Sequence, residues 1–438
     1  MNAALPAHLS HIDAEVWPAV ATLPGDGARG AVLRRVGARR AEASFAAACR
    51  NAGLILDPNN DPDLIVLHEE LFLRIADSGW LGFAEGYLAG EWVAEDLPRV
   101  LAALIGIGYQ PVPMPVISGR RQAASEPEGE LPRELLDLYA GSDLLTCPGR
   151  FASGVSTTVR EPEPFGGRKR AVGFVDVTNV DAPVRPDRAD LPGAQARAAE
   201  ALLDAAGVGP GAYVLEFPAS GAGLARLAAE RGATIDVLSR DPAFTASIED
   251  SLAKREVDRR AVQVRDVQRA IPTREDWRGR YDAVVSLNKL PEVGHAAAMF
   301  RAIDRMLSAT GRAAVQTLVA TNAMTKSGRG ALAPLRDYIW PGLELNTIAE
   351  LHEVVNRTTG LTIVAREHSG SHAADTARLQ LEVFAARERE AAASGFDAVF
   401  RRLWNYQLAL VQALCELGEI DAVTMTLAHR PRRLEAQA

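Results

Sequence analysis

The sequence predicts an α/β protein whose larger part is a doubly wound, mostly parallel sheet, preceded by a smaller N-terminal α+β or helical domain. From residue 194 onward, short apolar runs alternate with helical patterns, as in consecutive β-α units. Gly232, Gly311 and Gly360 lie where a predicted helix turns into the next strand, which is typical of left-handed helix ends. Residues 213–217 form an apolar strand, and small residues follow it.

Residues 1–118 are predicted to form the N-terminal domain. An apolar run at 64–67 predicts a short buried strand, and residues 71–76 have helical spacing. The glycines and aromatic residues of 79–92 predict a tight turn that leads into a packed helix, and a further helix is expected at 97–104.

Residues 119–192 are predicted to be a linker and an irregular segment. Residues 119–134 are polar and contain Pro and Gly. Prolines recur through 148–192, so we expect either a functional flap or a disordered stretch there.

Residues 193–438 are predicted to form the α/β domain. The expected strands are 213–217, 234–238, 261–264, 281–287 and 311–318. The expected helices are 194–206, 224–231, 243–253, 296–307 and 395–420.

Composition excludes several classes of protein. The net charge of −8 argues against a dedicated nucleic-acid binder. Cys49, Cys147 and Cys415 are too widely spaced for a disulfide framework or a zinc ligand set, so no metal site is predicted. No apolar run is long enough to span a bilayer, and no secretory signal is present. We therefore expect a cytoplasmic chain.

Arginine clusters at 34–40, 168–170 and 430–433 have two interpretations. They are either solvated faces or contacts for anionic lipid headgroups.

The run at 82–92, Gly-Phe-Ala-Glu-Gly-Tyr-Leu-Ala-Gly-Glu-Trp, is similar to the Gly-x-Gly-Glu-Ser-Tyr-x-x-Gly-x-Trp motif of one enzyme family. That family is the cyclopropane-fatty-acyl-phospholipid synthases, which are S-adenosylmethionine (SAM)-dependent fatty-acid methyltransferases. Further similar pieces are Ala194-Gln195, residues 281–286, 338–342 and 395–397. Residues 16–20 also resemble the branch associated with methyl-branched, tuberculostearic-type fatty acids.

The resemblance implies a Rossmann-like class I methyltransferase domain and an N-terminal domain associated with lipid at the inner face of the membrane. The implied reaction is methyl transfer from SAM to the double bond of an unsaturated phospholipid acyl chain, giving a cyclopropane or a methyl branch. Bicarbonate is the implied base. The implied assembly is a homodimer, and a heteromer with a paralogue is the alternative.

The resemblance also places the cofactor residues. The family has a Glu/Asp-x-Gly-x-Gly-x-Gly turn after the first strand, and here Pro218 and Ser220 replace its first two glycines. The expected cofactor-binding residues are Glu216, Ser220, Gly221, Gly223, Ser239, Asp241 and Asp266. Ser and Asp at strand ends also commonly cap the helices that follow.

The expected catalytic residues are Cys147, Glu292, Gln316 and His372. Pro291 stands at the position of the family's glutamate, with Glu292 one residue later. Ala373 stands at the position of its tyrosine, with His372 adjacent.

Two readings follow for the activity. The chain is either an active methyltransferase for unsaturated acyl chains or a catalytically silent family member that binds lipid or partners an active enzyme. A further alternative is a methyltransferase with a different acceptor, which uses Glu292 or His372 as its base.

Overall fold

The computed structural model divides the chain into two compact units. It describes residues 6–24, 31–113, 135, 138, 148–164, 172–269, 271–273, 277 and 281–430. The first unit comprises residues 1–126, 323–341 and 381–419, and the second comprises 127–322, 342–380 and 420–438. The three consecutive segments expected from the sequence therefore differ from this division. Helical spacing identifies a helix, but not the unit on which that helix packs.

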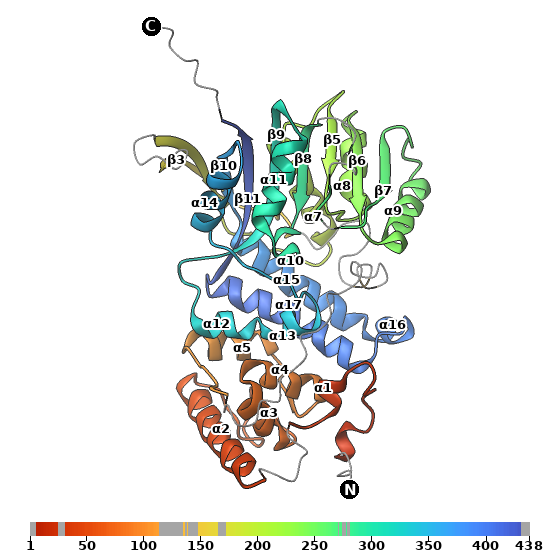
Figure 1. Cartoon of the computed structure of the whole chain (residues 1–438). Helices are drawn as coiled ribbons and strands as arrows, with labels where there is room; N and C mark the ends of the chain where they lie inside the picture. The colour runs from red at the N-terminus through yellow and green to blue at the C-terminus, as the bar shows by residue number, and fades with distance from the viewer. Residues whose placement is uncertain are drawn as a thin grey trace. The chain divides into compact units, whose positions relative to one another are not determined.

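The second unit is built on a nine-stranded sheet with the order β3-β4-β10-β11-β9-β8-β5-β6-β7 (Figure 1). Strands β5 to β8 and β9 pair in parallel, and β11 pairs antiparallel with both β9 and β10. The strands are β3 (Thr157–Pro164), β4 (Val172–Asn179), β5 (Tyr213–Glu216), β6 (Thr234–Ser239), β7 (Val262–Asp266), β8 (Tyr281–Leu287), β9 (Leu307–Ala320), β10 (Leu361–His368) and β11 (Ile420–His429). This confirms the predicted α/β class.

Helices cover both faces of this sheet, as its buried residues require. One apolar core joins the sheet to α7 (Leu191–Ala205), α8 (Ala222–Glu230) and α9 (Pro242–Lys254). A second core, on the other face, joins it to α11 (Ala296–Met306) and α14 (Ile348–Thr358). Strands buried on both faces read as continuous apolar runs, which is why 213–217, 234–238 and 281–287 were identifiable from sequence.

The expectation of an irregular segment at 148–192 is wrong for part of its length. Residues 157–164 and 172–179 form the antiparallel pair β3 and β4, and β4 pairs in parallel with β10. Pro162 and Pro164, which suggested irregular chain, lie on β3 at the edge of the sheet. An edge strand tolerates proline because one side of it has no ladder to maintain. The predicted linker at 119–134 lies outside the described residues.

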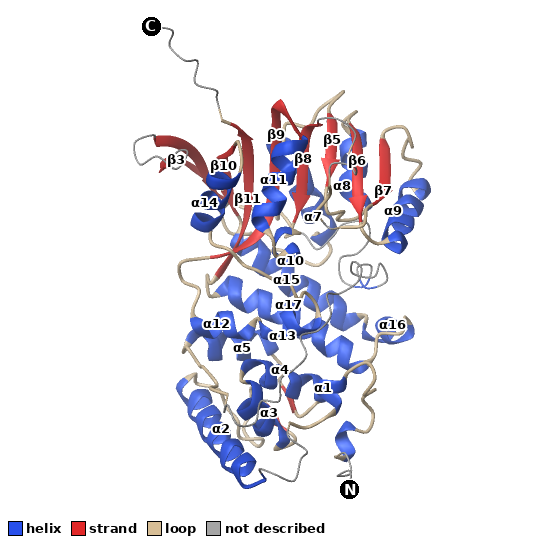
Figure 2. Cartoon of the chain, in the orientation of Figure 1, coloured by secondary structure: helices blue, strands red, loops and turns tan. Residues whose placement is uncertain are grey.

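The first unit is mostly helical (Figure 2). Its elements are η1 (Ala7–Leu9), α1 (Pro18–Ala21), α2 (Ala31–Asn51), β1 (Ile65–Val66), α3 (Glu70–Ser78), α4 (Trp80–Ala89), β2 (Trp92–Val93), α5 (Leu97–Gly106), α12 (Lys326–Ala331), α13 (Ala333–Tyr338), α16 (Glu388–Ala393) and α17 (Ala398–Glu416). The predicted helix at 395–420 is thus shorter, and β11 begins where it was expected to end. In the described ranges, none of the helices has the length and apolar character to cross a bilayer.

The motif at 82–92 is part of the packing of this unit. Gly82 and Gly86 lie on α4, and the indole N–H of Trp92 donates to the Phe83 carbonyl at 2.8 Å. The Phe83 and Trp92 rings stack with their centroids 4.3 Å apart. The Tyr338 hydroxyl donates to the buried carboxylate of Glu85 at 2.6 Å. The motif therefore has a structural role in addition to its value for recognising the family.

Candidate active site

The first cofactor segment follows β5. Glu216, the last residue of that strand, is fully buried. One of its carboxylate oxygens accepts hydrogen bonds from the main-chain N–H of Ser220, at 2.8 Å, and from the Ser220 hydroxyl. The buried acid therefore binds a serine four positions later in the chain, and this pair closes the turn.

Gly221 and Gly223 lead the chain from this turn into α8. Gly221 precedes the helix with φ of 131°, a backbone conformation that favours glycine. Gly223 is buried in the first turn of α8. The first N–H groups of a helix have no acceptor within it, so the start of α8 can bind a polar or anionic group of a ligand.

Ser239, Asp241 and Asp266 lie together at the ends of β6 and β7. Ser239 and Asp266 are register partners in the parallel ladder. The Asp241 carboxylate caps α9 by accepting from the N–H groups of Ala243 and Phe244, at 2.8 and 3.3 Å. Asp266 is exposed and accepts from the Thr245 hydroxyl at 2.5 Å. Asp241 thus caps a helix, whereas Asp266 keeps an exposed face that a ligand can reach.

Glu292 lies on α10 (Leu290–Val293), after β8. Its carboxylate pairs with the Lys289 ammonium at 3.0 Å, and the two side chains are 18% and 8% exposed. The sequence analysis did not identify Lys289. The signal for it was composition, because lysine occurs at only four positions in this chain and is rarely buried without a partner.

Gln316 lies near the end of β9, beside Leu287 of β8 in the parallel ladder. Its main-chain carbonyl accepts from the N–H of Asn288 at 2.8 Å. Its side chain is 5% exposed, and the amide oxygen has no hydrogen-bond partner among the described residues. A buried oxygen of this kind is costly unless something else satisfies it.

The structure gives His372, on α15 (Gly370–Ala386), a role that differs from the expected catalytic one. The ring is fully buried. Its Nδ1 accepts from the N–H of Phe151 at 3.0 Å, and its Nε2 lies 3.0 Å from the Asp181 carbonyl, to which it can only donate. Burial lowers the pKa of this imidazole. Since main-chain groups occupy both nitrogens, His372 fixes loops and is not free to act as a base.

Cys147 lies outside the described residues, so its catalytic role stays a prediction. The tyrosine position provides no catalytic group. Ala373 is buried on α15 and carries no polar atom in its side chain. Burial raises the pKa of the Cys49 thiol to about 12, so this cysteine is not a nucleophile near neutral pH.

The described candidates other than His372 gather at one edge of the sheet. Glu216, Ser239 and Asp266 end β5, β6 and β7. Glu292 follows β8, and Gln316 of β9 pairs with Leu287, the last residue of β8. The carboxyl ends of parallel strands form the crevice in which α/β proteins bind ligands. This edge therefore presents hydroxyl and carboxylate groups for a polar cofactor and an amide and a carboxylate for chemistry.

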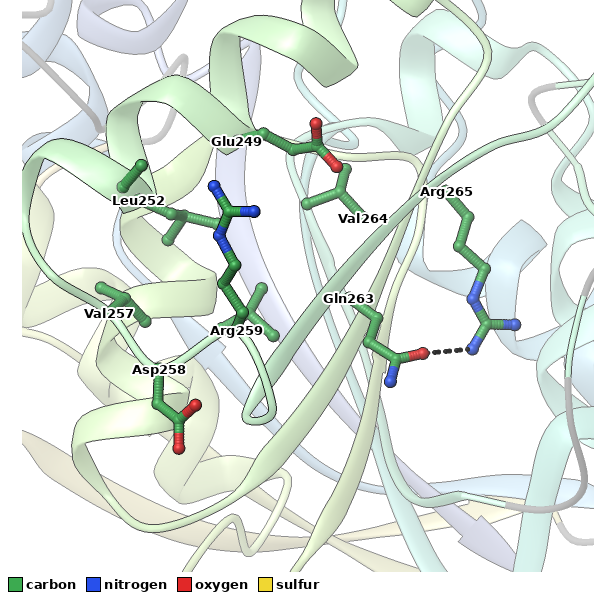
Figure 3. A pocket seen from close by; sticks show the side chains of 10 residues that line it. Glu249, Leu252, Val257, Asp258, Arg259, Gln263, Val264 and Arg265 are labelled. Atoms are coloured by element: carbon green, nitrogen blue, oxygen red, sulfur yellow. Dashed lines mark hydrogen bonds between the residues drawn. The ribbon is translucent and has the colours of Figure 1, made fainter.

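A separate cavity of about 340 Å³ lies beside β7 (Figure 3). Its lining includes Glu249, Asp258, Arg259 and Arg265, and Gln263 accepts from Arg265 at 3.2 Å. Residues 257–259 precede β7, so the cavity reaches the amino end of that strand. None of the expected site residues lines it.

The fold and this edge define a class I SAM-dependent methyltransferase architecture. Within that class, the chain belongs to the mycolic acid cyclopropane synthetase family, whose model matches residues 180–425. Members of this family are SAM-dependent methyltransferases that act on fatty-acyl chains. The match covers more than half of the chain and includes all the described candidates.

Individual proteins are also similar to this chain. The tuberculostearic acid methyltransferase UfaA1 of Mycobacterium tuberculosis is 28% identical over 95% of this chain and 96% of its own length. Among solved structures, the cyclopropane synthase MmaA2 of M. tuberculosis is 23% identical over 54% of this chain and 85% of its own, with a TM-score of 0.49. The mycolic acid cyclopropane synthase CmaA1, solved with SAH and CTAB, is 21% identical over 54% of this chain and 85% of its own, with a TM-score of 0.48.

Proposed function

We propose that this protein transfers a methyl group from SAM to a double-bond carbon of an unsaturated phospholipid acyl chain, giving a methyl-branched or cyclopropane product. The observation that carries the proposal is the similarity to the tuberculostearic acid methyltransferase across 95% of the chain, within a family of acyl-chain methyltransferases. The polar carboxyl edge of the sheet supports it.

The described residues suit SAM at this edge. The N-terminus of α8, Ser239 and the exposed face of Asp266 offer donors and acceptors for a cofactor that carries a carboxylate, a ribose and an adenine. When bound, SAM supplies an electrophilic methyl group. The chain's own task is to orient the acyl chain, exclude water and stabilise the positive charge that methylation leaves on the neighbouring carbon.

The side chains of Gln316 and Glu292 are suited to stabilise this positive charge. The amide oxygen of Gln316 is a buried dipole without a partner among the described atoms. The Glu292 carboxylate is the only base among the described catalytic candidates, because His372 is engaged at both nitrogens. Among the described residues, Pro291 and Ala373 provide no side-chain polar atom, so these two positions do not fit a bicarbonate cage.

The test of the proposal is direct. Purified protein is titrated with SAM and SAH by calorimetry, then incubated with SAM and vesicles of monounsaturated phospholipid. The proposal predicts micromolar cofactor binding and acyl chains that gain one carbon by mass spectrometry. Absence of both would overturn it.

Glu292→Gln is expected to lower the turnover number about 100-fold or more, because the carboxylate that removes the proton is lost. The affinity for SAM should stay unchanged, since the base acts after the cofactor binds. Single-turnover assays and calorimetry measure the two quantities. Full turnover in the variant would remove Glu292 as the base.

A catalytically silent role is the second candidate, and the turn after β5 favours it. The Ser220 hydroxyl, absent from a glycine turn, occupies the Glu216 carboxylate. In this role the protein would bind lipid or pair with an active methyltransferase.

Ser220→Gly and Ser220→Ala distinguish the two roles. If the serine blocks the cofactor, wild-type protein does not bind SAM and the glycine variant does. The alanine variant keeps Cβ and lacks the hydroxyl, so it shows which of the two prevents SAM from binding. Under our proposal the wild type binds SAM, and both variants remain within about tenfold of its affinity, a difference of about 1.4 kcal/mol.

We also propose that the first unit contacts anionic membrane surfaces through α2. Arg35, Arg39 and Arg40 are exposed on this helix, and Val36 between them is 54% exposed.

Charge reversal of all three arginines is expected to weaken co-sedimentation with anionic vesicles, since each basic residue near such a surface contributes about 1 kcal/mol. Reversal of the exposed Arg188, Arg259 and Arg260 is the control and should change little. Equal losses would contradict a specific role for α2.

A further inference from the structure

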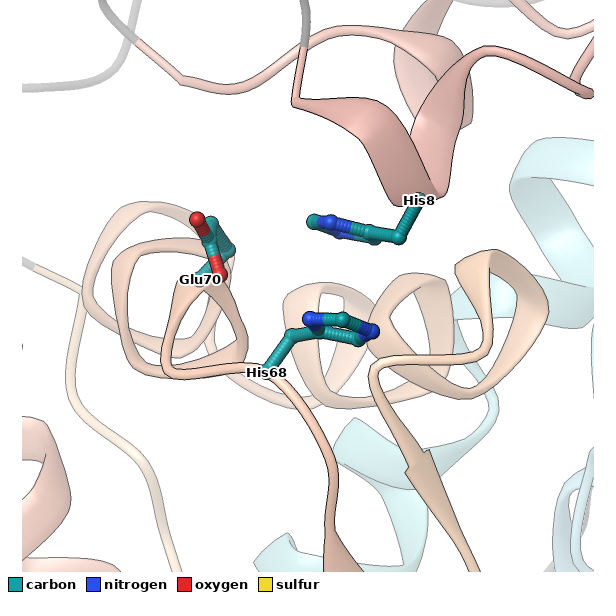
Figure 4. Close-up of side chains that lie close together, drawn as sticks. All are labelled: His8, His68 and Glu70. Atoms are coloured by element: carbon teal, nitrogen blue, oxygen red, sulfur yellow. The ribbon is translucent and has the colours of Figure 1, made fainter.

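A cluster of metal-ligating side chains lies in the first unit, apart from the candidate active site. His8 is in η1, His68 precedes α3, and Glu70 is the first residue of α3 (Figure 4). Each offers one ligand atom, and the three atoms all lie within 4.8 Å of one another. The two imidazoles are stacked, with centroids 3.8 Å apart and planes inclined by 10°.

The immediate surroundings leave one ring nitrogen of this cluster unsatisfied. The Nε2 atom of His8 is buried and has no hydrogen-bond partner among the described residues. The carboxylate of Glu91 lies 3.6 Å from it, which is too far for a hydrogen bond.

Two imidazoles and a carboxylate are a donor set for a borderline divalent ion. Zinc is typically bound by histidine nitrogens and carboxylate oxygens at about 2.0–2.2 Å in a tetrahedron. Neighbouring ligand atoms are then about 3.3 Å apart. The cluster is open by comparison, and its parallel rings cannot both point at one ion, so binding requires one imidazole to rotate about its side-chain bonds.

We propose that His8, His68 and Glu70 bind a divalent transition-metal ion, with zinc as the best fit. The fourth position is taken by water or by Glu91. Near this cluster, the described residues include the carboxylates of Glu70 and Glu91 and one buried guanidinium, that of Arg74, which limits the repulsion of a bound ion. The ion would tie the N-terminal η1 segment to the start of α3.

The proposal is tested on the full-length chain without a histidine tag, after removal of metal with a chelator. Calorimetry with zinc chloride is expected to give one equivalent bound with micromolar or tighter affinity. Cobalt(II) should produce the visible absorption of a low-symmetry, four-coordinate site. A chain that binds no zinc, or several equivalents with equal weak affinity, overturns the proposal.

Single variants assign the ligands. His8→Ala and His68→Ala should each weaken zinc binding at least about tenfold and abolish the cobalt spectrum. His11→Ala is the matched control, because His11 is an exposed histidine near His8, and it should bind as wild type does. Glu70→Gln keeps the shape of the side chain and removes its charge, so it tests the site even if an alanine variant fails to fold. Wild-type affinity in Glu70→Gln together with either folded alanine variant overturns the assignment.

Discussion

Arg74→Met is expected to destabilise the first unit by about 3–5 kcal/mol, which is the usual cost of breaking a buried ion pair from one side. The Arg74 guanidinium is fully buried, and its Nε donates to Glu91 at 2.8 Å. Its two other nitrogens donate to the carbonyls of Ala19 and Val20, at 3.0 and 2.7 Å. Methionine fills similar space but leaves a carboxylate and two carbonyls without their donor.

The pH dependence identifies the cause of this loss. Burial raises the pKa of Glu91 to about 7, even with Arg74 beside it. A carboxyl whose folded pKa is raised stabilises the fold below its ordinary pKa, and this contribution is lost as the pH rises through 7. Without Arg74 the charged form costs more, so the defect of Arg74→Met should be larger at pH 8 than at pH 5.

Urea unfolding at both pH values measures the effect, with two comparisons. Arg99→Met removes an exposed ion pair with Asp63, in which the arginine is 59% exposed, and should cost at most about 1 kcal/mol. Arg74→Met combined with Glu91→Leu removes both charges and should recover part of the stability. A loss in Arg74→Met no larger than in Arg99→Met would contradict the argument.

The strands that the sequence predicted are those with strong local signals. The runs at 213–217, 234–238 and 281–287 lie inside a parallel sheet, and burial on both faces makes such strands uniformly apolar. Strands β4, β10 and β11 are not uniformly apolar, and their place in the sheet depends on partners far along the chain. A pattern in one segment does not contain that information.

In the candidate site, too, some features were predictable from the sequence and others were not. The resemblance placed Glu216 in the first expected strand and Ser239 and Asp266 just after the second and third. In the structure these three residues end β5, β6 and β7. The hydrogen-bond partners of each side chain were not predictable. His372 is held by Phe151 and Asp181, which are 221 and 191 residues away in sequence. Such contacts arise only when the tertiary structure forms.

Gly82→Ala is expected to destabilise the first unit by more than about 3 kcal/mol, although alanine is normally the better helix former by about 1 kcal/mol. A Cβ at residue 82 would lie 1.9 Å from the carbonyl oxygen of Arg74 and 2.9 Å from the main-chain nitrogen of Ile75. These atoms belong to the backbone of α3, so no side-chain rotation relieves the overlap. The two helices would have to separate along their contact.

Gly86→Ala, four residues later on the same helix, is the matched comparison. Its Cβ would lie 2.5 Å from a terminal methyl of Leu71 and at least 3.2 Å from Glu91 and Trp92. A leucine methyl can move, so the expected change is within about 1 kcal/mol of wild type. Thermal and urea unfolding of both variants test the contrast. Similar losses for the two would mean that α3 and α4 adjust as easily to a backbone overlap as to a side-chain one, and Gly82 would then lose its role as the residue that permits their close approach.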